Sequence, residues 1–139
     1  MSGPRRDPDV IRVTGSTLAE LFENAAAAVF DRSFELDGVA PTYSRPIVAP
    51  GDSVAELLDN WLAAVREESA RAGIVFSSFV VDRLEEGGVQ GAASGMPSDH
   101  VVTRPRVVRS VRVDGSPVEV ADGWWALLSL DWSRPLRSV

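Results

Sequence analysis

Two stretches of the chain place apolar residues at helical spacing. In residues 18–30 and again in residues 54–72, apolar side chains recur every three or four positions, which is the pattern of a helix with one buried face. Each stretch follows a capping box, Thr-Leu-Ala-Glu at residues 17–20 and Ser-Val-Ala-Glu at residues 53–56. We therefore predict two amphipathic helices, the second of which ends at Gly73.

Most of the remaining apolar residues fall in short β-branched and aromatic runs, separated by glycine, proline and aspartate. Such runs are typical of strands. Asp-Gly pairs at residues 114–115 and 122–123 favour hairpin turns, because both central residues of a type I′ turn need a positive φ. The predicted strands are residues 10–15, 43–49, 74–82, 89–94, 107–113, 118–120 and 124–132.

The order of these elements predicts the fold class. Two helices lie among the first strands, and a run of about five strands follows. This order favours an α+β domain, with a mostly antiparallel sheet and two amphipathic helices packed on one face. At 139 residues the chain has the length of one ordinary domain. We expect a flexible N-terminal segment at residues 1–9, a single domain at residues 10–139, and no internal repeat.

The composition limits the classes of function. The chain has no cysteine and no lysine, which excludes thiol nucleophiles, thiolate metal sites and Schiff-base chemistry. A net charge of −6 argues against a protein that binds nucleic acid over its whole surface. Residues 16–99 carry fourteen acidic and five basic side chains, whereas residues 100–139 carry four and six, so the C-terminal region is mildly basic.

Nothing in the sequence indicates a membrane or secretory protein. No apolar run approaches the ~20 residues that a membrane span requires, and the N-terminus lacks the apolar stretch of a secretory signal. We expect a cytoplasmic location, no membrane partner and no direct sequence-specific binding of nucleic acid.

His100 is the only histidine, and Asp99 precedes it. Adjacent residues do not make a catalytic triad, and the Gly-x-Ser-x-Gly motif of many serine hydrolases is absent, so a hydrolase is not favoured. One histidine without cysteine also excludes the usual zinc ligand sets. The remaining metal option is an oxygen-ligand site for a hard cation such as calcium or magnesium.

Asp131 and Arg109 interrupt apolar rows in the C-terminal strands. Alternation places Asp131 at the end of a row with Trp125, Leu127 and Ser129, where its carboxylate is solvated, paired or bound to a cation. Alternation also places Arg109 among valines, where it either extends to water at the sheet edge or contacts an anion or carboxylate. The nearby arginines are interpreted as a solvated face: Arg104, Arg106 and Arg112.

Taken together and in order, several segments resemble the archease family, over about residues 11–132. They are Gly-Ser-Thr-Leu-Ala-Glu-Leu-Phe-Glu-Asn-Ala-Ala at residues 15–26, Leu-Asp-Asn-Trp-Leu at residues 58–62, Val75-Phe76 with Phe79, Val-Arg-Ser-Val at residues 108–111 before Asp114-Gly115, Gly123-Trp124, and Leu130-Asp131. The resemblance implies a small α+β protein that is not itself an enzyme. Members of the family assist the RtcB-type tRNA-splicing RNA ligase, promote its guanylylation and turnover, and bind calcium or a similar ion through aspartates.

The sequence departs from the family pattern at two places. Where the family has His-x-Ala-Asp before its first strand, residues 5–8 read Arg-Arg-Asp-Pro, with Pro8 at the position of the functional aspartate. Asp7 or Asp9 could supply a carboxylate only if the backbone shifts by one residue, which turns a strand side chain to the other face. The usual lysine of the family motif Val-Lys-Ala-Val is Arg109 here, which retains the charge but has a planar head group.

The leading hypothesis is an archease-like accessory protein that activates an RtcB-type RNA ligase. The resemblance implies a site for Ca²⁺ or a similar divalent cation formed by Asp131, the carbonyl of Trp132, and Asp9 or Asp7. Arg109 and His100 are the residues expected to face the partner. The alternative is a degenerate binding or chaperone-like module on the same fold, without ligase activation.

Overall fold

The computed structural model describes residues 9–133, which form strands and helices in close to the predicted order. The elements are β1 (Asp9–Gly15), α1 (Leu18–Ser33), β2 (Tyr43–Gly51), α2 (Val54–Ala72), β3 (Ile74–Glu85), β4 (Gly87–Pro97), the short 3₁₀ helix η1 (Ser98–His100), β5 (Val107–Val120) and β6 (Gly123–Ser133). Residues 1–8 of the N-terminal segment that we expected to be flexible lie outside the described residues. Asp9, the last residue of that segment, is the first residue of β1.

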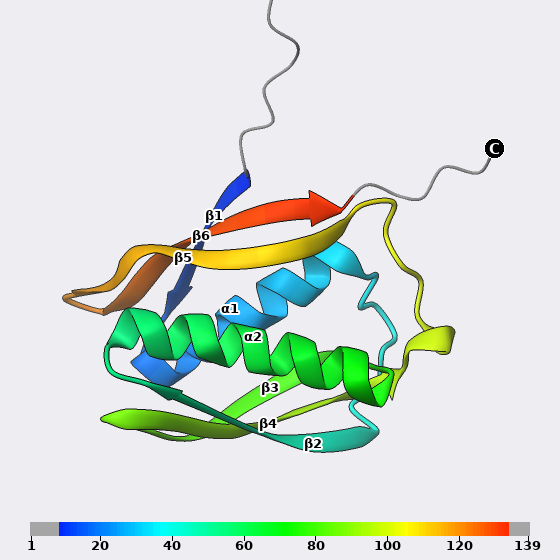
Figure 1. Ribbon diagram of the computed structural model, residues 1–139, viewed down its shortest axis with the longest axis horizontal. Helices are drawn as coiled ribbons and strands as arrows, with labels where there is room; N and C mark the ends of the chain where they lie inside the picture. The colour runs from blue at the N-terminus through cyan, green and yellow to red at the C-terminus, as the bar shows by residue number, and fades with distance from the viewer. Residues whose placement is uncertain (1–8, 134–139) are drawn as a thin grey trace, which may run out of the picture.

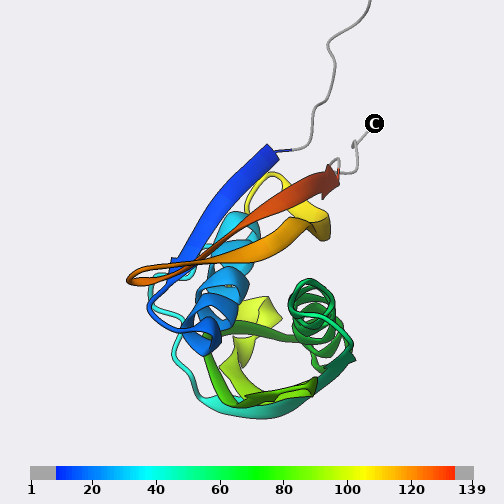
Figure 2. The same ribbon diagram turned by 90° about the vertical axis from the view of Figure 1, so that its left-hand side faces the viewer.

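The strands form two antiparallel sheets of three strands, in the orders β1-β6-β5 and β2-β4-β3. The two helices lie between these sheets (Figures 1 and 2). The α+β class and the antiparallel pairing are thus confirmed, whereas the single sheet with helices on one face is replaced by three layers. The strand pattern could not predict this division, because alternation shows which face is buried but not which strands pair.

The first Asp-Gly pair of the C-terminal region is a bulge and not a turn. β5 is continuous, and its residues 115–117 face Ala126 alone, because Asp114 pairs with Leu127 and Val118 with Trp125. The hairpin closes later, where Val120 pairs with Gly123. The predicted strand of residues 118–120 is therefore the end of β5, because a glycine with positive φ fits a bulge as well as a turn.

Both helices begin as the capping boxes predict. The Thr17 hydroxyl accepts a hydrogen bond from the amide of Glu20, at 3.0 Å, and the Ser53 hydroxyl accepts one from the amide of Glu56, at 3.1 Å. Helix α2 also ends as predicted, with Gly73 in the left-handed conformation. Helix α1 continues to Ser33, three residues beyond the predicted end at residue 30.

The two strand-helix units are an internal repeat, contrary to the expectation of none. Residues 15–24 read GSTLAELFEN and residues 51–60 read GDSVAELLDN. In both units the glycine lies so close to the helix that a Cβ would meet the backbone of Leu21 or Leu57. In both, the final asparagine donates a hydrogen bond to a carbonyl at the end of the preceding strand. The same local sequence therefore forms the same strand-helix corner twice.

The repeated units interlock through the acidic residue before each asparagine. Glu23 of α1 accepts a hydrogen bond from the amide of Val81 in β3, and Asp59 of α2 accepts one from the amide of Val113 in β5, both at 2.8 Å. Strand β1 pairs in the sheet that contains β5, whereas α1 contacts β3 of the other sheet. Each unit thus adds a strand to one sheet and bonds the other through its helix.

One hydrophobic core joins both sheets and both helices. The indole of Trp61 is fully buried in it, and its Nε1 donates a 3.0 Å hydrogen bond to the carbonyl of Phe22 on the other helix. Ala126, Leu128 and Leu130 of β6 face this core and are all buried. Within residues 9–133, neither helix combines the length and apolar character needed to cross a membrane.

Candidate functional site at one rim of the β1-β6-β5 sheet

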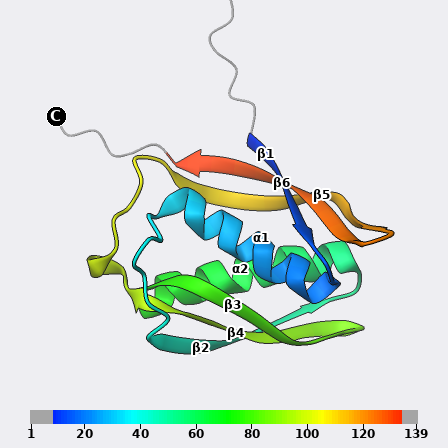
Figure 3. The ribbon, with the colours of Figure 1, turned by 180° about the vertical axis from the view of Figure 1, so that it is seen from behind.

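The first strand and the last strand of the described chain meet at one rim. Strands β1, β6 and β5 lie side by side (Figure 3). Asp9 of β1 is opposite Leu130 of β6, and Val108 near the start of β5 is opposite Trp132. The rim therefore gathers side chains from the start, the end and a middle part of the sequence. Four of the six predicted site residues lie on it: Asp9, Arg109, Asp131 and Trp132.

A β-bulge turns Arg109 out of the row of valines. Val108 pairs with Trp132 and Ser110 with Asp131, which leaves Arg109 as an extra residue on β5. Its side chain is 67% exposed, and Nη2 donates a hydrogen bond to Oδ2 of Asp131. The alternation-based placement of Arg109 among Val107, Val111 and Val113 is therefore wrong. The alternative in which it contacts a carboxylate is correct.

The Asp131 carboxylate is ionised and oriented by its neighbours. Its Oδ2 accepts from Arg109, and its Oδ1 accepts from the backbone amide of Trp132, at 3.0 Å. The hydrogen bond from Arg109 is the largest reason why the pKa of Asp131 lies below its ordinary value of 3.8. The pair therefore stays charged at neutral pH, and about half of the carboxylate's surface remains accessible to a partner.

A second cluster surrounds the indole of Trp132. Its Nε1 donates to Oδ2 of Asp9, at 2.9 Å, and the guanidinium of Arg106 lies over its ring, 4.5 Å from the centroid. Nη2 of Arg106 is also 3.5 Å from Oδ2 of Asp9. Sequence reasoning assigned Arg106 to a solvated face, and no local signal could correct this, because its partners lie far away in the sequence.

The described residues do not fit the predicted cation. Asp9 shares a face of the sheet with its partner Leu130 and with Trp132, whereas the next residue after Leu130, Asp131, lies on the opposite face. Each carboxylate already has an arginine beside it. Within residues 9–133, no group of three or more acidic or histidine side chains could bind a metal ion. Asp7, the remaining predicted ligand, lies outside the described residues.

His100 lies apart from the rim, in η1 between β4 and β5. Its Nε2 is 3.8 Å from Oδ1 of Asp99, and both side chains are exposed. Within the described chain, no hydrogen bond or ion pair connects it to a serine or to the rim residues. A charge relay for hydrolysis needs a buried and oriented carboxylate, so this pair does not support hydrolase chemistry.

Comparison with known proteins identifies the family. The model of the Archease protein family (MTH1598/TM1083) matches residues 9–127. The chain belongs to the archease family. It is 37% identical over 120 residues to the protein archease of Methanopyrus kandleri, a match that covers 82% of this chain and 84% of that protein. It is 30% identical over 125 residues to the protein archease of Methanosarcina acetivorans, with 84% of each covered.

The archease fold is confirmed by a solved structure. The solution structure of Methanobacterium thermoautotrophicum protein 1598 superposes with a TM-score of 0.76 at 24% identity, and the match covers 93% of this chain and 95% of that one. The family-model match begins at the first residue of β1 and ends at Leu127, before Asp131. The archease fold therefore extends over both sheets, and the C-terminal end of the rim lies just beyond the matched residues.

Proposed function

We propose that this archease-family chain is a non-enzymatic accessory protein in the cytoplasm, which activates an RtcB-type tRNA-splicing RNA ligase by promoting its guanylylation and turnover. The ligase is the protein partner. The observation that carries the proposal, beside family membership, is the exposed and oriented pair of Arg109 and Asp131. An exposed guanidinium next to a carboxylate can recognise a complementary charge pair or a phosphate, and neither group is a catalytic nucleophile in this setting.

The proposal is tested by measuring guanylylation of the cognate ligase with and without the purified chain. We expect the wild-type chain to raise the rate of guanylylation and the number of ligation cycles. Arg109→Gln should reduce this stimulation, because the amide cannot replace the planar, charged guanidinium. Arg83→Gln on the other sheet is the matched control, because Arg83 is also an exposed strand arginine. No stimulation and no binding by the wild-type chain would refute the proposal.

A calcium-type site at the rim is a separate proposal, with Asp131, the Trp132 carbonyl, and Asp7 or Asp9 as ligands. Because Asp9 and Asp131 lie on opposite faces, the site depends on Asp7 or on a rearrangement of the rim. Calcium titration followed by thermal unfolding tests it. Binding to the native state alone would add about 2.7 kcal/mol of stability at a concentration of 100 Kd. Asp131→Asn should abolish the gain, and an unchanged unfolding temperature would contradict the site.

The alternative is a binding or chaperone-like module on the archease fold that does not activate a ligase. Two observations favour it: the arginine, aspartate and proline at residues 5–8 in place of His-x-Ala-Asp, and the absence of a three-ligand acidic group within the described residues. The two functions separate in one experiment. Binding of the ligase without an increase in its guanylylation rate would favour this alternative.

A further inference from the structure

Within residues 9–133, one edge of strand β5 pairs with no other strand, and helix α2 packs against it instead. Unpaired amides and carbonyls along such an edge need other partners. Asp59 accepts from the amide of Val113, and Arg66, two turns later on the same helix, donates to the edge through Nη2. One acidic and one basic side chain of α2 thus bond three backbone groups of β5 where a strand would otherwise lie, and the Ser33 hydroxyl of α1 accepts from the amide of Val108, at 2.9 Å.

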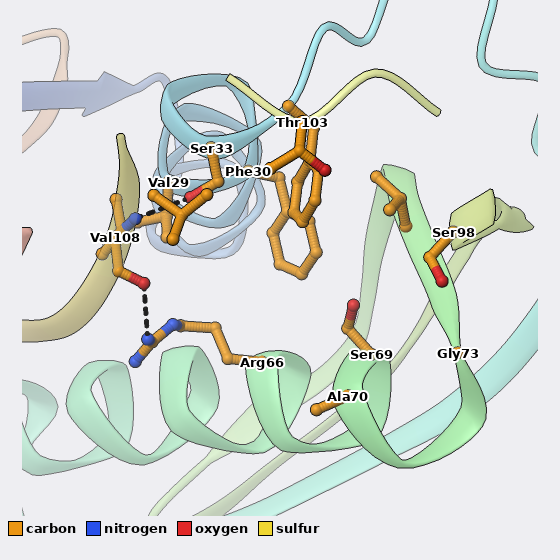
Figure 4. Close-up of a pocket in the computed structure, with 13 residues that line it drawn as sticks. Val29, Phe30, Ser33, Arg66, Ser69, Ala70, Gly73, Ser98, Thr103 and Val108 are labelled. Carbon is orange, nitrogen blue, oxygen red and sulfur yellow. Dashed lines mark hydrogen bonds between the residues drawn. The ribbon is translucent and has the colours of Figure 1, made fainter. Parts of the chain in front are cut away.

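Arg66 bonds the two carbonyls that frame the bulge. Its Nη2 lies 3.2 Å from the carbonyl oxygen of Val108 and 2.7 Å from that of Arg109, and Figure 4 shows the first of these bonds at the end of a pocket between the helices. Because these carbonyls precede and follow the bulged residue's own Cα, fixing both restricts the backbone dihedrals that aim the Arg109 side chain.

Burying the Arg66 guanidinium at this contact costs desolvation free energy. The guanidinium is about half buried, and this desolvation lowers the pKa of Arg66 below its ordinary value. Within the described residues it forms no ion pair with a carboxylate, so its burial is compensated by the two carbonyls. Its charge also lies on the helix side of β5, where it disfavours an inward orientation of the second arginine, Arg109.

The strand that packs against the other repeated helix, α1, has the same bulge, but no arginine within the described residues reaches it. Strand β3 has an extra residue, Ser77, at the place that corresponds to Arg109. The helix position that corresponds to Arg66 is Phe30, whose ring packs 5.9 Å from Phe76 and 5.4 Å from Phe79. The bulge of β3 therefore forms without an arginine at this helix position, and the hydroxyl of the bulged Ser77 donates to the carbonyl of Val39, at 3.0 Å. Arg66 is present only where α2 packs on β5, and there the bulged side chain of Arg109 must point toward Asp131.

We propose that Arg66 is a positioning residue, which fixes the bulge of β5 so that Arg109 points outward to Asp131 and is presented to a partner. The effect on a ligase rests on the proposed function. The orientation of Arg109 does not, and it can be measured on the chain alone.

The first measurement is the order of the Arg109 side chain by ¹⁵N relaxation of its Nε–Hε group. We expect an ordered signal in the wild-type chain and a mobile one in Arg66→Met, which keeps the length of the side chain but loses the donor. Arg66→Lys, which retains one charged donor, should restore part of the order. Arg71→Met is the matched control on the same helix, because Arg71 is exposed and bonds Glu68 instead of β5. Equal order in wild type and Arg66→Met would overturn the proposal.

The second measurement is a double-mutant cycle on ligase stimulation. If Arg66 acts through Arg109, Arg66→Met and Arg109→Met should reduce stimulation by the same factor, and the double variant should lose no more than either single variant. Losses that multiply would overturn positioning in favour of an independent structural role. If the wild-type chain does not stimulate the ligase, the proposed function fails, and the relaxation measurement still decides the role of Arg66.

Discussion

Replacing Gly95 by alanine tests whether the bulge of β3 at Ser77 depends on glycine in β4. Phe76 pairs with Gly95 and Ser78 with Ser94, so the bulged residue Ser77 crowds this point of the ladder. A Cβ on Gly95 would overlap the carbonyl oxygen of Val75, which is part of the paired backbone and not a flexible side chain. Gly95→Ala therefore forces the two strands apart.

The expected cost is at the upper end of the range for overpacking, about 3 kcal/mol, because the atom that must move belongs to the backbone of a paired strand. Gly88 in the same strand is the matched control. A Cβ there would lie 3.7 Å from the nearest atom, the Ala49 carbonyl oxygen, which is ordinary contact. Gly88→Ala should stabilise by about 0.4–1 kcal/mol, because alanine reduces the entropy of the unfolded chain.

Urea unfolding measures both variants under the same conditions. The difference of about 3–4 kcal/mol between them corresponds to midpoints separated by about 2 M, for an m value of about 2 kcal/mol/M. The m value should be unchanged, since the same surface becomes exposed. If Gly95→Ala unfolds at the same urea concentration as Gly88→Ala, the bulge does not require glycine and the reasoning is refuted.

Three further predictions concern the rim, the core and the helix ends. Because the pKa of Asp131 lies below its ordinary value of 3.8, its pairing stabilises the fold at pH values above 3.8, and this stabilisation is lost as the pH falls through the folded pKa. NMR titration should show the depressed pKa of Asp131, and Arg109→Gln should raise it. Trp61→Phe removes a buried hydrogen bond and should cost about 1–3 kcal/mol in urea unfolding, whereas an unchanged midpoint would contradict it. Thr17→Ala and Ser53→Ala should each cost about 1 kcal/mol and add in the double variant, because the caps belong to different helices; thermal unfolding checks this.

The sequence by itself predicted the features that depend on nearby residues. Both helices and their capping boxes follow from spacing within a few turns. The ordered motifs also predicted the archease family, which the comparisons confirm. The repeat at residues 15–24 and 51–60 is also local, and the matching hydrogen bonds of its two asparagines show that it has a structural role.

Tertiary structure decided the features that depend on pairing between distant residues. The register of β1 on β6 sends Asp9 and Asp131 to opposite faces, although both were expected to bind one ion. One extra residue in β5 turns Arg109 from the valine row to Asp131, and Arg66 reaches that bulge from a helix far away in the sequence. Strand alternation specifies a face only once the register is known, and a bulge reverses it at a single residue. For that reason the sequence determined which elements form, whereas the direction of the rim side chains was determined only when the strands paired.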